Sequence, residues 1–178
     1  MIAQFDGFEI NLLHAGDAWK LCDFVVTNTE RLKRYFPKTL SQNLNPTLSE
    51  LYVQHKIKAI AKNEVFVFTI KLTETRQLIG LVILKELDWN KKQGEFAYCV
   101  DYRYEGKGLI SKAINVLSAH AINNLDLEIL QIISHKDNFG SIKVATNNGY
   151  VWQDTLKGAF TPTGESPLDM ELYELYKV

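Results

Sequence analysis

The sequence is poor in cysteine and has no long apolar run. Its two cysteines, Cys22 and Cys99, lie far apart, with no histidine or cysteine beside them at the spacing of metal ligands. Such sparse cysteine is typical of a reduced cytoplasmic protein and excludes a disulfide-rich secreted scaffold. The longest apolar run, residues 78–84, is far too short to span a bilayer. We therefore expect a cytoplasmic protein with no membrane partner.

Charge of one sign is also missing. The chain has 20 Lys and Arg residues against 21 Asp and Glu residues, and its formal net charge is −1. This balance does not suggest the basic surface of a nucleic-acid-binding protein. The four histidines are scattered without pairing, so no metal site is predicted. The N-terminus lacks the basic region and apolar core of a signal peptide.

The composition that remains is that of an ordinary globular domain. Hydrophobic residues make up 46% of the chain and charged residues 23%. A chain of 178 residues is long enough for one sizeable core, and no repeat, low-complexity tract or linker divides it. We expect a single domain, residues 1–178, that exists as a monomer or a homodimer.

Hydrophobic patterning predicts an alternation of strands and helices. One helix is predicted to be capped by Asp17 and to end at Pro37. A second begins at a T-x-x-E capping box, Thr47 to Glu50, after a polar loop at residues 38–46. A third ends near Asn124, and a short fourth ends at Asn148. The strand, helix, strand order around the third helix implies one parallel, right-handed crossover. The predicted strands are residues 8–13, 65–72, 78–84, 94–101, 128–134, 150–155 and 168–177.

A glycine-rich turn is the most informative stretch of the chain. Gly106 and Gly108 sit where a strand pattern ends and a helix pattern begins. A helix that opens on such a turn leaves backbone N–H groups without intrahelical partners, and the helix dipole adds positive potential. These features predict an anion site, although an ordinary strand-to-helix turn has the same pattern. A second segment, from Asn138 to Tyr150, favours the functional interpretation.

Several short motifs of the chain form a recognisable set. They are Arg103-x-x-Gly106-x-Gly108, Asn138-x-x-Ser141, Asn148-Gly149-Tyr150, Asn28-x-x-x-Leu32, Tyr35-Phe36-Pro37, Leu78-Ile79-Gly80 and Glu95-x-x-Tyr98. These motifs resemble those of the GNAT acyltransferases and, within that superfamily, those of the RimJ/RimL-like branch, which acetylates the N-termini of ribosomal proteins. The chain departs from this branch at Ala97, where glycine is usual, and at Lys112, where glutamate is usual.

The resemblance implies a fold and a cofactor. The fold would be α/β, with a central, mixed but mostly antiparallel seven-stranded sheet and helices on both faces. Acetyl-CoA would be the cosubstrate, with no metal. Its pyrophosphate would bind the N–H groups of the turn, and its pantetheine arm would bind the preceding strand. The implied cofactor-binding residues are Tyr98, Cys99, Val100, Arg103, Gly106, Lys107, Gly108, Leu109, Ile110, Ser111, Asn138 and Ser141.

Some of these assignments have simpler alternatives. Lys107 fits a phosphate contact and a solvated loop lysine equally well. Asn138 would hold the far end of the pantetheine or serve only as a helix cap. In many relatives a tyrosine acid stands seven residues after this asparagine, but here the position is Ala145. Ser141 is the substitute candidate for the acid, and it could instead only anchor the cofactor.

Acetyl transfer to an amine also needs a base, because the attacking amine must lose a proton. Glu95 is the candidate base, acting directly or through a water, and its alternative is an exposed strand glutamate. Backbone N–H groups of the same strand would stabilise the oxyanion. Tyr35 and Phe36, together with Glu95, would contact the substrate, whereas Trp89 is predicted in the core. A thiol with a pKa of about 8.5 is a tolerable leaving group even without an acid.

The predicted activity is acetyl-CoA-dependent N-acetylation of a primary amine, with a protein N-terminus as the acceptor and direct attack on the acetyl group. One alternative is the same chemistry on a small amine such as a polyamine, an amino acid or an antibiotic. The other is a CoA-binding regulatory module without turnover, which the absent tyrosine favours and Glu95 opposes. The loops that would select the acceptor, residues 37–46 and 158–167, carry no readable specificity code.

Overall fold

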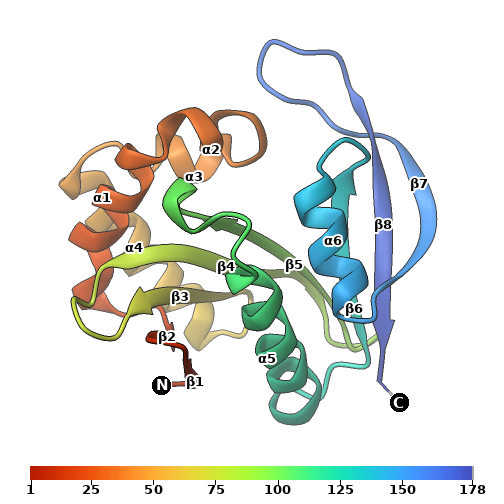
Figure 1. Ribbon diagram of the computed structural model, residues 1–178, viewed down its shortest axis with the longest axis horizontal. Helices are drawn as coiled ribbons and strands as arrows, with labels where there is room; N and C mark the ends of the chain where they lie inside the picture. The colour runs from red at the N-terminus through yellow and green to blue at the C-terminus, as the bar shows by residue number, and fades with distance from the viewer. Residues whose placement is uncertain (178) are drawn as a thin grey trace. The chain divides into compact units, whose positions relative to one another are not determined.

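The computed structural model describes residues 1–177, and Figure 1 shows the course of the chain. The chain divides into two compact units. The first comprises Met1–Ile83 and Tyr98–Glu105, and the second comprises Leu84–Ala97 and the chain from Gly106 onward. A single domain over residues 1–178 stays a prediction, and its last residue lies outside the described part of the chain.

The first unit contains a helical layer and the N-terminal strands. Its helices are α1 (Ala18–Thr27), α2 (Thr29–Tyr35), α3 (Pro37–Ser41) and α4 (Pro46–Ala61), and two 3₁₀ turns cover Ala15–Asp17 and Tyr102–Tyr104. Its strands are β1 (Ala3–Phe5), β2 (Phe8–Leu12) and β3 (Phe66–Leu72), together with the start of β4 (Leu78–Asp88) and the end of β5 (Gln93–Val100).

The second unit contains the rest of β4 and β5 and all the later elements. These are α5 (Leu109–Asn124), β6 (Ile129–His135), α6 (Phe139–Asn147), β7 (Val151–Phe160) and β8 (Leu168–Tyr176). In this unit β5 pairs with β6 in parallel, over Gln93–Phe96 and Ile129–Ile132, and β8 pairs antiparallel with both β6 and β7. The predicted parallel crossover is therefore confirmed.

Over residues 1–177 the sheet has eight strands rather than the predicted seven, in the order β1-β2-β3-β4-β5-β6-β8-β7. The additional strand is β1, which pairs antiparallel with β2. Its turn is Asp6-Gly7, with φ values of 48° and 80°. Positive φ at both turn residues is the geometry that an Asp-Gly pair favours in a two-residue hairpin. The sequence signal was present, but a strand of three residues has too little alternation to reveal itself.

The helical layer differs from the prediction at three points. The helix predicted from Asp17 to Pro37 breaks at Asn28, whose φ of −107° and ψ of 22° are not helical, and becomes α1 and α2. The predicted loop at residues 38–46 contains α3. The capping box at Thr47 is wrong, because Asn45 caps α4 by accepting a hydrogen bond from the Leu48 N–H at 3.0 Å. Pro46 then occupies the first helical position, where its missing N–H costs nothing.

The core of the first unit lies between its helices and its strands. Leu21, Phe24 and Val25 of α1 and Val53 of α4 are buried in one cluster with Val67 of β3 and with residues of β4, which are Leu78, Leu81 and Ile83. Leu81 and Ile83 lie on one face of β4, because the strand period of two places every second side chain on the same face. In the second unit, Trp89 is 43% exposed in the turn after β4, so its prediction as a core residue is wrong.

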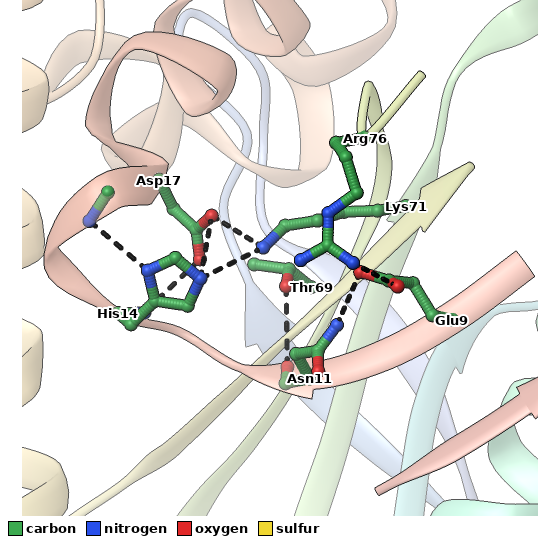
Figure 2. Close-up of polar contacts among 8 residues, drawn as sticks. Glu9, Asn11, His14, Asp17, Thr69, Lys71 and Arg76 are labelled. Carbon is green, nitrogen blue, oxygen red and sulfur yellow. Dashed lines mark hydrogen bonds and ion pairs between the residues drawn. The ribbon is translucent and has the colours of Figure 1, made fainter. Parts of the chain in front are cut away.

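In the first unit, a buried ion pair joins Asp17, directly before α1, to Lys71 of β3 (Figure 2). Lys71 of β3 and Asp17 are both fully buried, and Lys71 Nζ lies 2.5 Å from Asp17 Oδ1. The other oxygen, Oδ2, accepts a hydrogen bond from the His14 N–H at 3.1 Å. Asp17 was predicted to cap the first helix, but its side chain makes no capping bond to α1. Its role is to neutralise the buried lysine.

Replacing Lys71 with methionine is expected to lower the free energy of unfolding by about 3–5 kcal/mol, because the Asp17 carboxylate then stays buried without its cation. The matched control is Lys33→Met, which removes a cation from the exposed pair with Glu30. An exposed pair contributes about 0–1 kcal/mol. Urea unfolding of both variants checks the expectation, and equal losses would contradict the structural role of the buried pair.

Candidate functional site

The glycine-rich turn opens α5 in the geometry that the sequence predicted. Gly106 and Gly108 have φ values of 71° and 74°, and Gly108 is the N-cap of the helix. A Cβ atom built on either glycine meets no described atom within 4 Å. Glycine is therefore required by the backbone conformation, and the space beside the turn is open. The N–H groups of the first helical turn, from Leu109 to Ser111, have no intrahelical partner.

A polar contact ties the first turn of α5 to the end of α6. Asn148 Nδ2 donates to Ser111 Oγ at 3.1 Å and to the Val144 carbonyl oxygen at 2.8 Å. At the other end of α6, the Asn138 side chain caps the helix by accepting a hydrogen bond from the Ser141 N–H at 3.2 Å. Asn138 is thus a helix cap, as its simpler interpretation predicted. Its Nδ2 group is not used by that cap.

Glu95 lies on β5 with a partner that the sequence did not reveal. Its carboxylate is 12% exposed and lies 2.8 Å from Lys85 Nζ of β4. Glu95 also stands opposite Gln131 of β6, which donates to Glu174 Oε1 of β8 at 2.6 Å. The candidate base therefore belongs to a polar strip across four strands. Lys85 was missed because β4 continues beyond the predicted end at Leu84 to Asp88.

The segment from Asn138 to Tyr150 contains both the position of the missing tyrosine, Ala145, and the substitute candidate for the acid, Ser141. Ala145 is fully buried, and its carbonyl oxygen accepts from the Tyr150 N–H at 3.1 Å. The Tyr150 hydroxyl lies 2.8 Å from Ser118 Oγ, inside the core of the second unit. Ser141 is half-buried at the start of α6. Among the described residues of this segment, Ser141 is the hydroxyl at the position that the resemblance favours.

In the first unit, Tyr98, Cys99 and Val100 form the half-buried end of β5, beyond the ladder with β6. Burial raises the pKa of the Cys99 thiol to about 12, so this cysteine is held neutral. Arg103 follows in the 3₁₀ turn. Its Nε and NH2 atoms each donate to the Asp101 carboxylate at 2.8 Å. These two residues also line a pocket of about 270 Å³ beside α1 and the β3–β4 turn.

Asp101 is the second functional residue that the sequence did not reveal. It is 1% exposed, and besides the Arg103 side chain it accepts the Arg103 N–H at 3.0 Å and the Asn28 amide at 3.2 Å. The hydrogen bond from the Arg103 side chain is the main reason that the pKa of Asp101 falls to about 2. Four donors on one carboxylate strongly favour its ionised form.

Tyr35 and Phe36, the two aromatic residues predicted to contact the substrate, have different surroundings. Tyr35 ends α2, is half-buried, and has the Arg34 guanidinium 5.4 Å from its ring centroid. Phe36 joins α2 to α3 and packs against the hydrophobic cluster of the first unit. Both side chains are half-buried, and of the two only Phe36 is known to pack against the hydrophobic cluster.

Within residues 1–177, no group of three or more His, Cys, Asp or Glu side chains is arranged to hold a metal ion. In the same range, no helix combines the length and the apolar character needed to cross a membrane.

A mixed sheet whose parallel pair flanks a glycine-opened helix, together with comparison to known proteins, defines an acyltransferase. The model of the acetyltransferase (GNAT) domain family matches residues 9–151, so the chain belongs to this family. Its activity is accordingly that of a GNAT N-acetyltransferase, and its named relatives are of the RimJ/RimL-like kind.

Two curated relatives are similar in sequence. The ribosomal-protein-serine acetyltransferase of Escherichia coli (strain K12) is 31% identical over 83 residues, which is 47% of this chain and 46% of that protein. The chain thus spans about half the length of this relative. A Bacillus subtilis (strain 168) protein, provisionally named as a ribosomal N-acetyltransferase, is 25% identical over 170 residues, or 94% of this chain and 90% of that protein.

Solved structures share the fold at lower identity. The ribosomal-protein-S5-alanine acetyltransferase of Vibrio fischeri has a TM-score of 0.91 at 20% identity, covering 98% of this chain and 95% of that one. A ribosomal L7/L12 alpha-N-protein acetyltransferase in complex with coenzyme A has a TM-score of 0.88 at 19% identity, covering 98% and 97%. A spermidine N-acetyltransferase chimera from Vibrio cholerae and hSSAT has a TM-score of 0.75 at 20% identity, covering 96% of each chain.

The depressed pKa of Asp101 predicts how stability responds to acid. Its stabilising contribution is complete above the unfolded value of 3.8 and is lost as the pH falls toward about 2. The free energy of unfolding of the wild type should therefore exceed that of Asp101→Asn by a constant amount above about pH 5. In acid this difference should fall by up to about 2 kcal/mol. Urea unfolding at a series of pH values checks this. An advantage independent of pH would contradict the assigned hydrogen bonds.

Proposed function

We propose that the chain binds acetyl-CoA and transfers its acetyl group to the α-amino group of a protein N-terminus. The observation that carries the cofactor assignment is the turn at Gly106 and Gly108, whose left-handed glycines leave open space in front of unpaired helical N–H groups. A diphosphate has the charge and the acceptor oxygens that such a helix start binds. The family membership and the coenzyme A complex of the fold relative support the same cofactor.

The cofactor would be held by groups on both sides of this turn. The N–H groups of residues 106–111 would bind the pyrophosphate, with Lys107 adding charge. Arg103 has donors left over from its pair with Asp101, since a guanidinium carries five N–H groups. The backbone of Tyr98, Cys99 and Val100 would bind the pantetheine, because β5 extends past its ladder with β6. The Nδ2 group of Asn138 and the Ser141 hydroxyl would contact its far end.

In the reaction, the amine nitrogen forms a bond to the thioester carbonyl carbon, and the bond from that carbon to sulfur breaks. The proton lost by the amine goes to Glu95, directly or through one water, and the thiolate sulfur leaves with the electron pair. Ser141 would donate a proton to that sulfur or only anchor the cofactor. Lys85 would fix the orientation of the Glu95 carboxylate through their ion pair. Tyr35, with Phe36 behind it, would border the acceptor.

The Gly108→Glu variant is expected to abolish acetyl-CoA binding, because a carboxylate would enter the proposed phosphate cradle. The matched control is Gly164→Glu. Gly164 also has a positive φ, 78°, and no described atom within 4 Å of an added Cβ, but it lies in the β7–β8 loop. Both variants thus carry the same backbone strain and added charge. Titration calorimetry with acetyl-CoA separates them, and wild-type affinity in Gly108→Glu would contradict the cradle.

The Glu95→Gln variant is expected to lower kcat near neutral pH by about 10²–10⁴-fold, the usual contribution of a general base. The loss should shrink as the pH rises, since more of the amine is then already neutral. Lys85→Gln removes the same ion pair from the other side but leaves the Glu95 carboxylate as a proton acceptor, so its loss of kcat should be clearly smaller. Steady-state kinetics of both variants decide the role. Equal losses would mean that the ion pair, and not a proton acceptor at Glu95, is what matters.

The acceptor is tested with a matched pair of peptides and a polyamine. A peptide with a free α-amino group should be acetylated faster at pH 7 than the same peptide with a blocked N-terminus and one lysine. The physical reason is that the α-amino pKa of roughly 7.7–8 lies well below the lysine value of about 10.4. Spermidine serves as the small-amine competitor, and mass spectrometry reads out each product. If only spermidine is acetylated, the proposal of a protein N-terminus is wrong and the acceptor is a small amine. The spermidine N-acetyltransferase among the fold relatives supports this alternative.

A further inference from the structure

Asn28 lies at the break between α1 and α2, and its side chain is committed to the segment that leads into the glycine turn. It is 2% exposed. Its Nδ2 group donates to the Phe24 carbonyl oxygen at 2.9 Å and to Asp101 Oδ2 at 3.2 Å. Its Oδ1 atom accepts the Tyr102 N–H at 3.0 Å. One buried amide therefore joins the helical layer to the residues that follow β5.

The segment that it holds, residues 101–105, is a closed turn. The Asp101 carboxylate accepts hydrogen bonds from the Arg103 N–H and the Arg103 guanidinium. The backbone carbonyl oxygen of Asp101 accepts a hydrogen bond from the Tyr104 N–H at 2.9 Å. The Tyr104 ring meets Phe8 of β2 edge to face, with 6.0 Å between the centroids. Because these contacts are mutual, displacement of one residue of the turn displaces the others.

A second contact joins α2 to the last residue of this segment. Arg31 NH1 lies 2.5 Å from Glu105 Oε2, with both side chains partly exposed. The hydrogen bond raises the pKa of Arg31 and lowers the pKa of Glu105, so both groups stay charged. Glu105 directly precedes Gly106, so this pair ends where the glycine turn begins.

We propose that Asn28 is a positioning residue for the cofactor: it presets the conformation of residues 101–105 and thereby that of the glycine turn. The inference rests on the proposed binding of acetyl-CoA at this turn. A loop that is already ordered before its ligand arrives loses less conformational entropy on binding, and this raises affinity without a direct contact.

The chain offers a matched control for Asn28. Asn43 is also a fully buried asparagine of the first unit, and its Nδ2 group donates to the Thr39 carbonyl oxygen at 2.8 Å. Its Oδ1 atom accepts from Ser49 Oγ at 2.9 Å. These contacts hold the connection between α3 and α4 and include none of residues 101–105. Asn28→Ala and Asn43→Ala therefore remove similar hydrogen bonds from similar burial at two different places.

The test measures acetyl-CoA affinity by titration calorimetry at a temperature at which circular dichroism shows each variant folded. Asn28→Ala should bind acetyl-CoA about ten-fold or more weakly, within the usual range of a coupling between sites. Asn43→Ala should bind as the wild type does. Hydrogen exchange at the Tyr102 amide should accelerate only in Asn28→Ala. Equal affinities of Asn28→Ala and the wild type would overturn the inference, as would an equal loss in Asn43→Ala.

A second pair of variants keeps the inference testable where Asn28→Ala does not fold. Arg31→Gln removes the partly exposed tether to Glu105, and Lys33→Gln removes a neighbouring exposed pair, with Glu30, on the same helix. Arg31→Gln should weaken acetyl-CoA binding and Lys33→Gln should not. No difference between them would overturn the inference. Absence of acetyl-CoA binding by the wild type would instead refute the proposed function, so the two failures are distinguishable.

Discussion

The buried carboxylate of Asp101 is the acceptor around which the chain turns after β5. Four donors from Arg103 and Asn28 converge on its two oxygens, and the pKa of about 2 reflects this convergence. No neutral side chain has enough lone pairs to accept all of them, so an aspartate is needed here. The turn that it stabilises, residues 101–105, directly precedes Gly106 in the sequence.

The catalytic proposal depends on a similar arrangement of charge in the second unit. Glu95 sits on a regular strand, so its backbone position is set by the pairing of β5 with β6. Its carboxylate direction is set by Lys85. A base must be held near the proton that it removes, and a rigid strand with one ion pair restricts the carboxylate better than a loop does. The glycine turn, in contrast, would bind the cofactor through backbone N–H groups, whose direction is fixed once the glycine conformations are fixed.

Much of the fold was predictable because its elements repeat a local pattern. The apolar residues alternate along β2 and β6 and follow helical spacing along α5. Because each pattern repeats several times, one residue that departs from it does not hide the element. The failures fall where a few residues decide the outcome. β1 has three residues, and the break at Asn28 is stabilised by Asp101, which is distant in the chain. The cap of α4 was misplaced by two residues, because Asn45 and Thr47 are both suitable caps and only the structure shows which one is used.

The candidate site divides in the same way. The conformation of the glycine turn was predictable because the motif Arg103-x-x-Gly106-x-Gly108 lies where a strand pattern ends and a helix pattern begins, whereas the role of Glu95 as a base stays a prediction. Lys85 and Asp101 were not predictable. The ion pair of Lys85 depends on the register between neighbouring strands, and the burial of Asp101 depends on the path of α1 and α2. A single sequence states neither. The exposure of Trp89 was missed for a related reason: a large aromatic residue in a turn has no periodic neighbours to indicate which way it faces.

The central claim, that acetyl-CoA binds the open glycine turn at the start of α5, is tested most directly by mapping the binding site on the backbone itself. Acetyl-CoA is added stepwise to ¹⁵N-labelled protein, and the amide resonances are followed. We expect the largest shifts at Gly106, Gly108 and the N–H groups of residues 109–111, with saturation, and no shift at Gly164. No saturable shift at these amides, or shifts centred on another part of the chain, would contradict the account.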